Sequence, residues 1–361
     1  MGTDPKNGRG GGSPPAPAAG MAVAVGLAAA GAVAVFGAFL RQRRRIELAG
    51  KVVLVTGGSR GLGLVLARRL AAEGAYVALC ARDAEDLESA RSQIRGETGR
   101  DVVSLTADLT DRAQAADVIR QVTEKLGPVD VLINNAGIIK VGPMETMTEA
   151  DYEEAMALHF WAPFHTVHAV LPSMRQRGAG RIVNISSIGG KIAVPHLLPY
   201  SASKFALTGF SEGLRAELLP QNIFVTTVCP GLMRTGSPRN AEFKGQHEKE
   251  YAWFAVSDSL PFLSQSAGSA AERILDALRH GDAEVVTTLP AQVAVVAHGL
   301  MPGVVSDALS VAHRLLPEPG GIGTDSRAGS ESETPLTRSP LTALTRKAEQ
   351  RNNQLDSSPA A

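Results

Sequence analysis

The sequence feature that most constrains the fold is a glycine-rich turn between an apolar run and an amphipathic segment. The run Lys51–Thr56 has the β-branched, continuously apolar character of a buried parallel strand. The turn that overlaps its end reads TGGSRGLG. A helical pattern over residues 62–73 then directs Leu66 and Leu70 inward. Strand, turn and helix in this register predict a parallel α/β unit whose helix N-terminus can hold a phosphate group.

A second chemical pattern lies between Arg181 and Lys204. It opens with the apolar residues of a predicted strand, continues through Ser187 and a Gly pair, and ends in a helix predicted to begin near Tyr200. Tyr200 and Lys204 are four residues apart, so in a helix they project from one face. An ammonium near a phenol favours the phenolate, which makes Tyr200 a candidate general acid and base. Ser187 can donate a hydrogen bond to the oxygen of a substrate held beside Tyr200.

These two patterns occur in order with two others, the NNAG turn at Asn134–Gly137 and the pair Pro230-Gly231. Ser187 lies thirteen residues before Tyr200. In this order and spacing the motifs resemble the short-chain dehydrogenase/reductase family over residues 50–288. Both ends of the chain lie outside the resemblance.

The resemblance implies a fold and a reaction. The fold is expected to be α/β, a Rossmann-like doubly wound parallel sheet in a single domain over residues 46–290, with a lid insertion near residues 233–262. The reaction is expected to interconvert a carbonyl and an alcohol, with hydride from a nicotinamide cofactor and a proton from Tyr200. Ser187 would orient the carbonyl oxygen. Lys204 would lower the pKa of Tyr200 and bind the nicotinamide ribose.

The resemblance also implies a set of cofactor-binding residues. They lie in the glycine-rich turn, after the next strands and on the Tyr200 helix. By family position, Asp108 contacts the adenine ring and Thr235 contacts the nicotinamide amide. The set consists of Thr56, Gly57, Ser59, Arg60, Gly61, Gly63, Arg82, Asp108, Asn134, Ala136, Gly137, Tyr200, Lys204, Pro230, Gly231 and Thr235.

The end of the second predicted strand bears on the choice of cofactor. NAD-binding relatives carry an acidic residue there, about twenty residues beyond the glycines, to hold the ribose 2′-hydroxyl. Counting from the glycine turn puts Ala81 in that place, with Arg82 after it. Arg82, joined by Arg60, suits a 2′-phosphate, so NADP(H) is the preferred cofactor. Asp83 is interpreted as a helix N-cap, but it leaves NAD(H) open as an alternative.

One position departs from the family pattern. Relatives place an asparagine in a V-N-x-x-G pattern as the fourth catalytic residue, whereas the run Leu158–Ala162 puts His159 there. In relatives that asparagine holds a helix kink and a water linked to the lysine. An imidazole can form similar hydrogen bonds. We therefore place His159 in the predicted catalytic set with Ser187, Tyr200 and Lys204. The substitution bears on the proton relay and not on the fold.

The N-terminal region predicts a membrane anchor. Residues 1–20 are rich in Gly, Pro and Ala and are expected to be a disordered tail. Residues 21–40 carry no charge and would form a helix about 30 Å long, the thickness of a bilayer core. The basic cluster at residues 41–45 predicts a single-pass anchor over residues 21–45, with the catalytic domain on the cytoplasmic side. That cluster argues against a cleaved signal peptide; a flexible apolar leader, or a start at Met21, is the remaining alternative.

The C-terminal region divides into two parts. Residues 291–316 are apolar but are interrupted by Pro302-Gly303, so they are expected to lie on a bilayer surface or to cover the active site rather than to span a membrane. Residues 317–361 are rich in Ser, Thr, Pro and Gly, which predicts a disordered tail.

Composition limits the partners. Lys plus Arg and Asp plus Glu both number 36, which predicts no nucleic-acid partner. Cys80 and Cys229 fit buried thiols in a reducing compartment, and no metal-ligand pattern occurs. An anchor and an aromatic lid favour a lipophilic carbonyl or alcohol as the small-molecule substrate. The resemblance leaves a homo-oligomer open, and His159 leaves a membrane-tethered dinucleotide-binding protein with little turnover as the alternative function.

Overall fold

The computed structural model describes residue 31 and residues 35–355, which divide into two units, residues 1–45 and 46–361. In the first unit, residues 35–43 are helical. The predicted N-terminal tail lies outside the described residues, and so does most of the predicted anchor. Where the chain is described, no helix combines the length and the apolar character needed to span a membrane.

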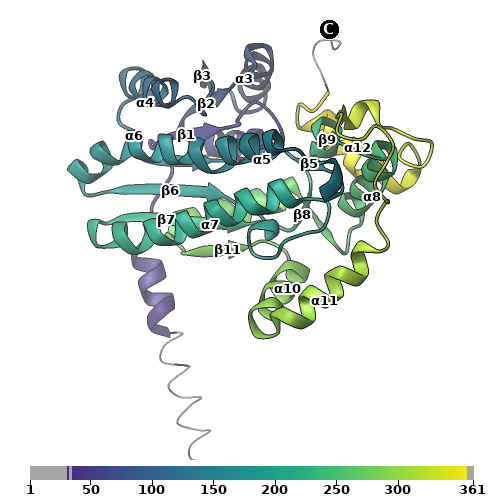
Figure 1. The fold of residues 1–361 in the computed structure, drawn as a ribbon. Helices are drawn as coiled ribbons and strands as arrows, with labels where there is room; N and C mark the ends of the chain where they lie inside the picture. The colour runs from purple at the N-terminus through teal and green to yellow at the C-terminus, as the bar shows by residue number, and fades with distance from the viewer. Residues whose placement is uncertain (1–30, 32–34, 356–361) are drawn as a thin grey trace, which may run out of the picture. The chain divides into compact units, whose positions relative to one another are not determined.

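The second unit is built on a parallel sheet with the order β11-β7-β6-β4-β1-β2-β3 (Figure 1). The order reverses between β1 and β4, so the carboxyl ends of these two strands open a crevice there. This arrangement confirms the predicted Rossmann-like doubly wound sheet in one domain. The strands are β1 (Val52–Thr56), β2 (Tyr76–Ala81), β3 (Val103–Thr106), β4 (Val131–Asn134), β6 (Gly180–Ile185), β7 (Ile223–Cys229) and β11 (Glu284–Val286).

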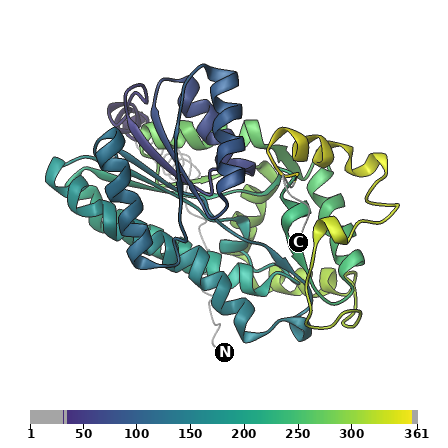
Figure 2. The same ribbon diagram turned by 90° about the horizontal axis from the view of Figure 1, so that it is seen from above.

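Helices cover both faces of this sheet, as the view in Figure 2 shows. Val53 and Val55 of β1 face one layer, while Val52 and Leu54 face the other, because side chains alternate along a strand. Both sets are buried, which explains the continuous apolar run. One layer contains α2 (Gly61–Ala72), α3 (Ala84–Thr98) and α9 (Ala267–His280); the other contains α4 (Arg112–Leu126), α6 (Ala162–Arg177) and α7 (Leu198–Leu218).

The helical stretch that precedes β6 contains an irregular turn. The structure has α5 (Glu149–Met156), a π-helical turn over Ala157–Trp161, and then α6. Such turns insert one residue into the hydrogen-bond ladder and commonly occur at functional sites. This turn carries His159, so the helix is irregular at the position that departs from the family pattern.

The lid insertion is folded around a small apolar cluster to which Val141 and Leu197, from outside the insertion, also belong. Beyond the sheet lie β5 (Lys140–Val141), β8 (Leu232–Arg234), β9 (Glu242–Phe243), α8 (His247–Ser259) and β10 (Ser264–Ser266). Phe243, Tyr251 and Phe254 are buried in this cluster, with Trp253 packed against it. The aromatic residues therefore hold the insertion in place, and Trp253 and Phe254 also line a cavity described below.

The apolar extension forms two helices, α10 (Leu289–Leu300) and α11 (Pro302–His313), separated at the predicted proline break. Many of its large apolar side chains are exposed, among them Val293, Val296, Val304 and Leu315.

The prediction of disorder after residue 316 was wrong for residues 317–355. This C-terminal segment, the yellow ribbon of Figure 1, lies beside the lid. Its strand β12 (Arg327–Ala328) pairs with β9, and its helix α12 (Ala343–Arg351) packs on α8. A polar composition predicts disorder when the side chains are solvated, but several polar side chains of this segment are buried and form hydrogen bonds within the protein. The Thr345 hydroxyl bonds to the Ser259 hydroxyl at 2.6 Å, and the Thr342 hydroxyl donates to the carbonyl of Thr337. The last residues of the predicted tail, 356–361, lie outside the described residues.

Candidate active site

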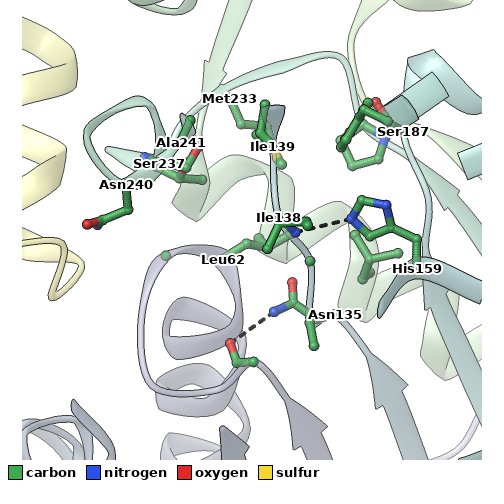
Figure 3. Close-up of a pocket in the computed structure, with 18 of the residues that line it drawn as sticks. Leu62, Asn135, Ile138, Ile139, His159, Ser187, Met233, Ser237, Asn240 and Ala241 are labelled. Atoms are coloured by element: carbon green, nitrogen blue, oxygen red, sulfur yellow. Dashed lines mark hydrogen bonds between the residues drawn. The ribbon is translucent and has the colours of Figure 1, made fainter. Parts of the chain in front are cut away.

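A cavity of about 890 Å³ lies at the carboxyl ends of the central strands (Figure 3). Its walls come from the glycine turn after β1, the NNAG turn after β4, the serines after β6 and the first turns of α7. Trp253 and Phe254 of the lid, with Leu263 just after it, line a further side of the cavity. The predicted catalytic and cofactor motifs therefore converge on one space.

Ser187, Tyr200 and Lys204 line this cavity together. Ser187 follows the end of β6, and its hydroxyl accepts a hydrogen bond from the backbone N–H of Gly189 at 3.0 Å. Tyr200 lies in the first turn of α7, where Pro199 favours a helix start. The Lys204 ammonium donates to the Ile185 carbonyl at 2.9 Å and lies 5.6 Å from the centroid of the Tyr200 ring.

Burial governs the ionisation of both catalytic groups. It raises the pKa of Tyr200, while a hydrogen bond with Ser187 acts in the opposite direction. Burial also lowers the pKa of Lys204 to about 7. In each case removal from water disfavours the charged form. We expected Lys204 to lower the pKa of Tyr200. In this structure burial raises it instead, so Tyr200 is a neutral phenol that can donate its proton.

His159 makes two hydrogen bonds from a fully buried position. Its Nε2 accepts from the backbone N–H of Ile138 at 3.1 Å, the dashed line in Figure 3. A backbone N–H can only donate, so the proton of the neutral ring is on Nδ1, which donates to the Ser203 hydroxyl at 2.7 Å. Ser203 in turn donates to the Tyr200 carbonyl at 2.9 Å. Burial lowers the pKa of His159 well below its usual value, which keeps the ring neutral.

The His159 ring also lies edge-on to the Tyr200 ring, with centroids 5.4 Å apart. Both of its nitrogens are occupied by the protein. His159 is therefore a positioning residue that holds the start of α7 against the NNAG turn.

The glycine turn requires its glycines for space. A Cβ on Gly63 would lie 2.0 Å from the carbonyl oxygen of Gly57, and one on Gly57 would lie 2.8 Å from the Cα of Ala136. Gly57 and Gly61 also have positive φ values, 60° and 58°, which glycine adopts without strain. The missing side chains leave a cradle of backbone N–H groups at the start of α2, in which the N–H of Gly61 donates to the Asn352 carbonyl at 2.9 Å. Such a cradle fits the pyrophosphate of a dinucleotide.

Asn135 braces this turn and was missed by the sequence analysis. Its side-chain amide donates to the carbonyls of Thr56 and Gly57 at 3.1 and 3.0 Å, the second drawn in Figure 3. The Thr56 hydroxyl accepts from the backbone N–H groups of Asn135 and Ala136 at 2.9 and 3.1 Å. The NNAG motif was the available signal, but it holds two asparagines and does not say which one faces the turn.

Three members of the predicted cofactor set do not line the cavity. Asn134 is buried, donates to Asn184 at 2.9 Å and accepts from Thr166 at 2.8 Å, so its side chain braces the sheet. Thr56 and Gly63 belong to the glycine turn itself: the Thr56 hydroxyl bonds to the NNAG turn, and Gly63 packs against the Gly57 carbonyl. The members on the cavity wall are Gly57, Ser59, Arg60, Gly61, Arg82, Asp108, Ala136, Gly137, Tyr200, Lys204, Pro230, Gly231 and Thr235.

The adenosine end of the cavity separates two candidate selectors. The Asp83 carboxylate caps α3 by accepting the backbone N–H of Asp86 at 2.8 Å, which confirms the N-cap interpretation. Arg82 is exposed on the cavity wall, and among the described residues no carboxylate forms an ion pair with it. The guanidinium of Arg60 forms an ion pair with the Asp86 carboxylate, with 3.8 Å between Nη1 and Oδ2.

Sequence reasoning also missed a contribution from the C-terminal segment. Gln354 is buried and lines the cavity, and Asn352 donates to the Thr235 carbonyl at 3.1 Å. No sequence signal marked these residues, because they lie in a stretch whose composition resembles a disordered tail.

Comparisons with known proteins agree with this geometry. Residues 51–244 match the family described as short chain dehydrogenase. The chain is similar to dehydrogenase/reductase SDR family member 7B of Mus musculus, with 35% identity over 263 residues, 72% of this chain and 79% of the relative. It is also similar to 3-ketodihydrosphingosine reductase of Bos taurus, with 36% identity over 189 residues, 51% of this chain and 57% of that protein.

A solved structure extends the comparison to a bound cofactor. The blue fluorescent protein from a metagenomic library, crystallised in complex with NADPH, aligns with a TM-score of 0.57 and 33% identity. The alignment covers 67% of this chain and 97% of that protein.

Proposed function

Since the chain belongs to the short-chain dehydrogenase/reductase family, enzymes that act on alcohol and carbonyl groups with NAD(P), we propose that it is an NADP(H)-dependent oxidoreductase for a lipophilic substrate. The observation that carries the proposal is the convergence of Ser187, Tyr200 and Lys204 on one cavity whose far end presents Arg82. Three intact catalytic positions favour turnover over a dinucleotide-binding protein that lacks it.

The protein groups divide the work of carbonyl reduction. Bound nicotinamide would supply the hydride. Tyr200, kept neutral by burial, donates its proton to the carbonyl oxygen, and Ser187 holds that oxygen by a hydrogen bond. Lys204, whose pKa burial lowers to about 7, carries a proton close to Tyr200 at little cost near neutral pH. His159 and Ser203 fix the backbone of Tyr200.

Arg82 supports the choice of NADP(H). It is exposed at the adenosine end, and the neighbouring Asp83 carboxylate is engaged as a helix cap. A guanidinium that no carboxylate of residues 35–355 pairs with can form charge-assisted hydrogen bonds with a 2′-phosphate. The experiment is a titration of NADPH and NADH against wild type and Arg82→Ala. We expect wild type to bind NADPH more tightly than NADH. We expect Arg82→Ala to lower the affinity for NADPH by about ten- to a hundredfold and to leave the affinity for NADH unchanged. If both affinities fall together, Arg82 is not the selector.

The lid supports a lipophilic substrate. Met233, Trp253, Phe254 and Leu263 line the cavity and present apolar surface there. The bovine relative is by its name a reductase of 3-ketodihydrosphingosine, a long-chain ketone. Turnover of long-chain ketones should therefore exceed that of short ones. Equal kcat/KM across chain lengths would refute this preference.

We also propose that residues 21–45 anchor the protein in a membrane with the catalytic domain on the cytoplasmic side. The uncharged stretch 21–40 and the basic cluster that follows it support this proposal. Deleting residues 1–45 should release the protein from membranes and leave NADPH binding intact. Recovery of the full-length protein in the aqueous fraction would refute the anchor.

A further inference from the structure

The end of the C-terminal segment lies across the entrance to the glycine turn. We call residues 351–354 the strap. They consist of the last residue of α12 and the three residues after it, and Asn352 and Gln354 are each only 3% exposed. A polar segment with this degree of burial is in contact with the domain on more than one side.

On one side the strap binds the glycine turn. The Asn352 carbonyl accepts the backbone N–H of Gly61, the first residue of α2, at 2.9 Å. The Asn353 side-chain amide donates to the Ser59 carbonyl at 3.0 Å. The Arg351 carbonyl accepts from Arg68 at 2.8 Å. Three consecutive residues are thus fixed to the turn and its helix.

On the other side the strap binds the loop after β8. The Asn352 side chain donates to the Thr235 carbonyl at 3.1 Å, and Asn240 donates to the Gln354 carbonyl at 3.0 Å. The strap therefore bridges the glycine turn and the Thr235 loop, both of which line the cavity.

The contact with Gly61 has the chemistry of a bound anion. The first N–H groups of a helix have no partner inside the helix and attract negative charge. A backbone carbonyl oxygen carries partial negative charge, so the Asn352 carbonyl takes the place of an anionic oxygen. A Cβ built on Gly61 would lie 2.9 Å from Gln354 Nε2, so the strap fills the space that the glycine leaves open.

We propose that the strap is an autoinhibitory segment that competes with the pyrophosphate of the dinucleotide for the N-terminus of α2. The inference rests on the proposed function only in that NADP(H) binds at the glycine turn. Cofactor and strap exclude each other at Gly61, so the cofactor binds only the fraction of molecules whose strap has been released. The observed affinity is reduced by that fraction.

The contacts that hold the strap are suited to release. They are hydrogen bonds between uncharged groups, apart from the one from Arg68, and each contributes little net stability because water can replace it. Asn353 also has a positive φ of 55°, which is less favourable for it than for glycine. A bound dinucleotide can therefore displace the strap without unfolding the sheet.

The test compares two truncations of the full-length protein by NADPH titration. One chain ends after Arg351 and lacks most of the strap; the matched control ends after Leu355 and keeps it. We expect the first truncation to bind NADPH at least about tenfold more tightly than wild type, and the control to match wild type. The full-length variant Asn353→Ala, which removes the Ser59 contact, should shift affinity in the same direction by a smaller factor. Thermal unfolding of each variant verifies folding.

The outcomes separate this inference from the proposed function. If both truncations bind NADPH as wild type does, the strap does not compete with the cofactor. If loss of the strap lowers the affinity for NADPH, the strap holds bound cofactor in place and the proposal is wrong. If no variant binds NADPH or NADH, the proposed function itself fails with it.

Discussion

The glycine turn and the C-terminal segment meet through the hydrogen bonds of Asn352 with Gly61 and of Asn353 with Ser59, yet they are held by opposite means. The turn sits on a buried apolar sheet, and backbone geometry requires each of its key glycines. The C-terminal segment buries mainly Ser, Thr, Asn and Gln side chains and is held by their hydrogen bonds. One region is fixed by shape, whereas the other is fixed by polar pairing.

This difference indicates which region can move. A fully buried Leu or Val contributes about 1.5–3 kcal/mol, and β1 and α2 contain many of them. A neutral hydrogen bond contributes about 0.5–1.5 kcal/mol net because water can replace it. The C-terminal segment can therefore detach at a free energy that leaves the glycine turn folded, as regulation at Gly61 requires.

The largest effect should come from removing the proton donor, Tyr200, from the active site on the apolar sheet. Tyr200→Phe removes the proton donor and keeps the ring that packs against Gly189, so kcat should fall by about a hundredfold or more. NADPH affinity should stay within about twofold. The matched control is Tyr76→Phe, which changes an exposed tyrosine outside the cavity. Steady-state kinetics with a long-chain ketone decides, and residual turnover near wild type would exclude Tyr200 as the donor.

A second effect tests whether the glycine turn is as tightly fixed as its geometry implies. Gly63→Ala places a Cβ 2.0 Å from the Gly57 carbonyl, so the backbone must shift. Unfolding free energy should fall by about 1–3 kcal/mol, and NADPH affinity should fall with it. Gly96→Ala, on α3 with open space around it, should instead stabilise by about 0.5–1 kcal/mol. Equal responses of the two variants in urea would show that the turn is not tightly packed.

A third effect concerns the departure at His159. His159→Leu leaves the Ile138 N–H without its acceptor, which should cost about 1–3 kcal/mol of stability and lower kcat through the start of α7. His159→Asn restores an acceptor for the Ile138 N–H and a donor for the Ser203 hydroxyl. Its kcat should therefore be close to that of wild type and higher than that of His159→Leu. If the Leu and Asn variants have the same kcat, the hydrogen bonds of His159 do not position Tyr200.

A fourth effect lies at the polar interface of the C-terminal segment. Burial raises the pKa of Asp258 to about 8, with Arg234 and the hydrogen bonds from Met233 and Thr345 acting against it. An unfolded Asp titrates near ~3.9, so between about pH 4 and 8 the folded protein keeps a proton that the unfolded chain has lost. Stability from this group is therefore complete below about pH 4 and declines as pH rises towards 8.

Asp258→Asn removes that titration. The stability of wild type relative to Asp258→Asn should decrease from pH 5 to pH 8 in urea unfolding. Parallel curves for the two proteins over this range would show that Asp258 is not protonated in the folded state.

The shape-fixed region could be predicted from sequence because its motifs are local. Strand, turn and helix are adjacent in the chain, and Tyr200 and Lys204 share a helix face by spacing alone. Side-chain alternation explains one of the misplaced contacts: β4 ends at Asn134, whose side chain donates to Asn184 of β6, so Asn135 reaches the glycine turn. The sequence could not show this, since it does not say at which residue the strand ends.

The C-terminal segment could not be predicted because its contacts are distant in sequence. Asn352 reaches Gly61 and Thr235, and Thr345 reaches Ser259. Composition reports how well side chains suit water, whereas their partners here are protein groups far away along the chain. The same reasoning explains why the polar shell around His159 was only partly foreseen, as it depends on Ile138 and Ser203.

The most direct test of the account is hydrogen exchange on the full-length protein with and without saturating NADPH. We expect NADPH to slow exchange of the amides in residues 57–63, where the cofactor binds. We also expect faster exchange in residues 343–355, because the strap is displaced and α12 loses its continuation. Slower exchange in both regions would contradict the account, since it would show that the C-terminal segment closes over bound cofactor.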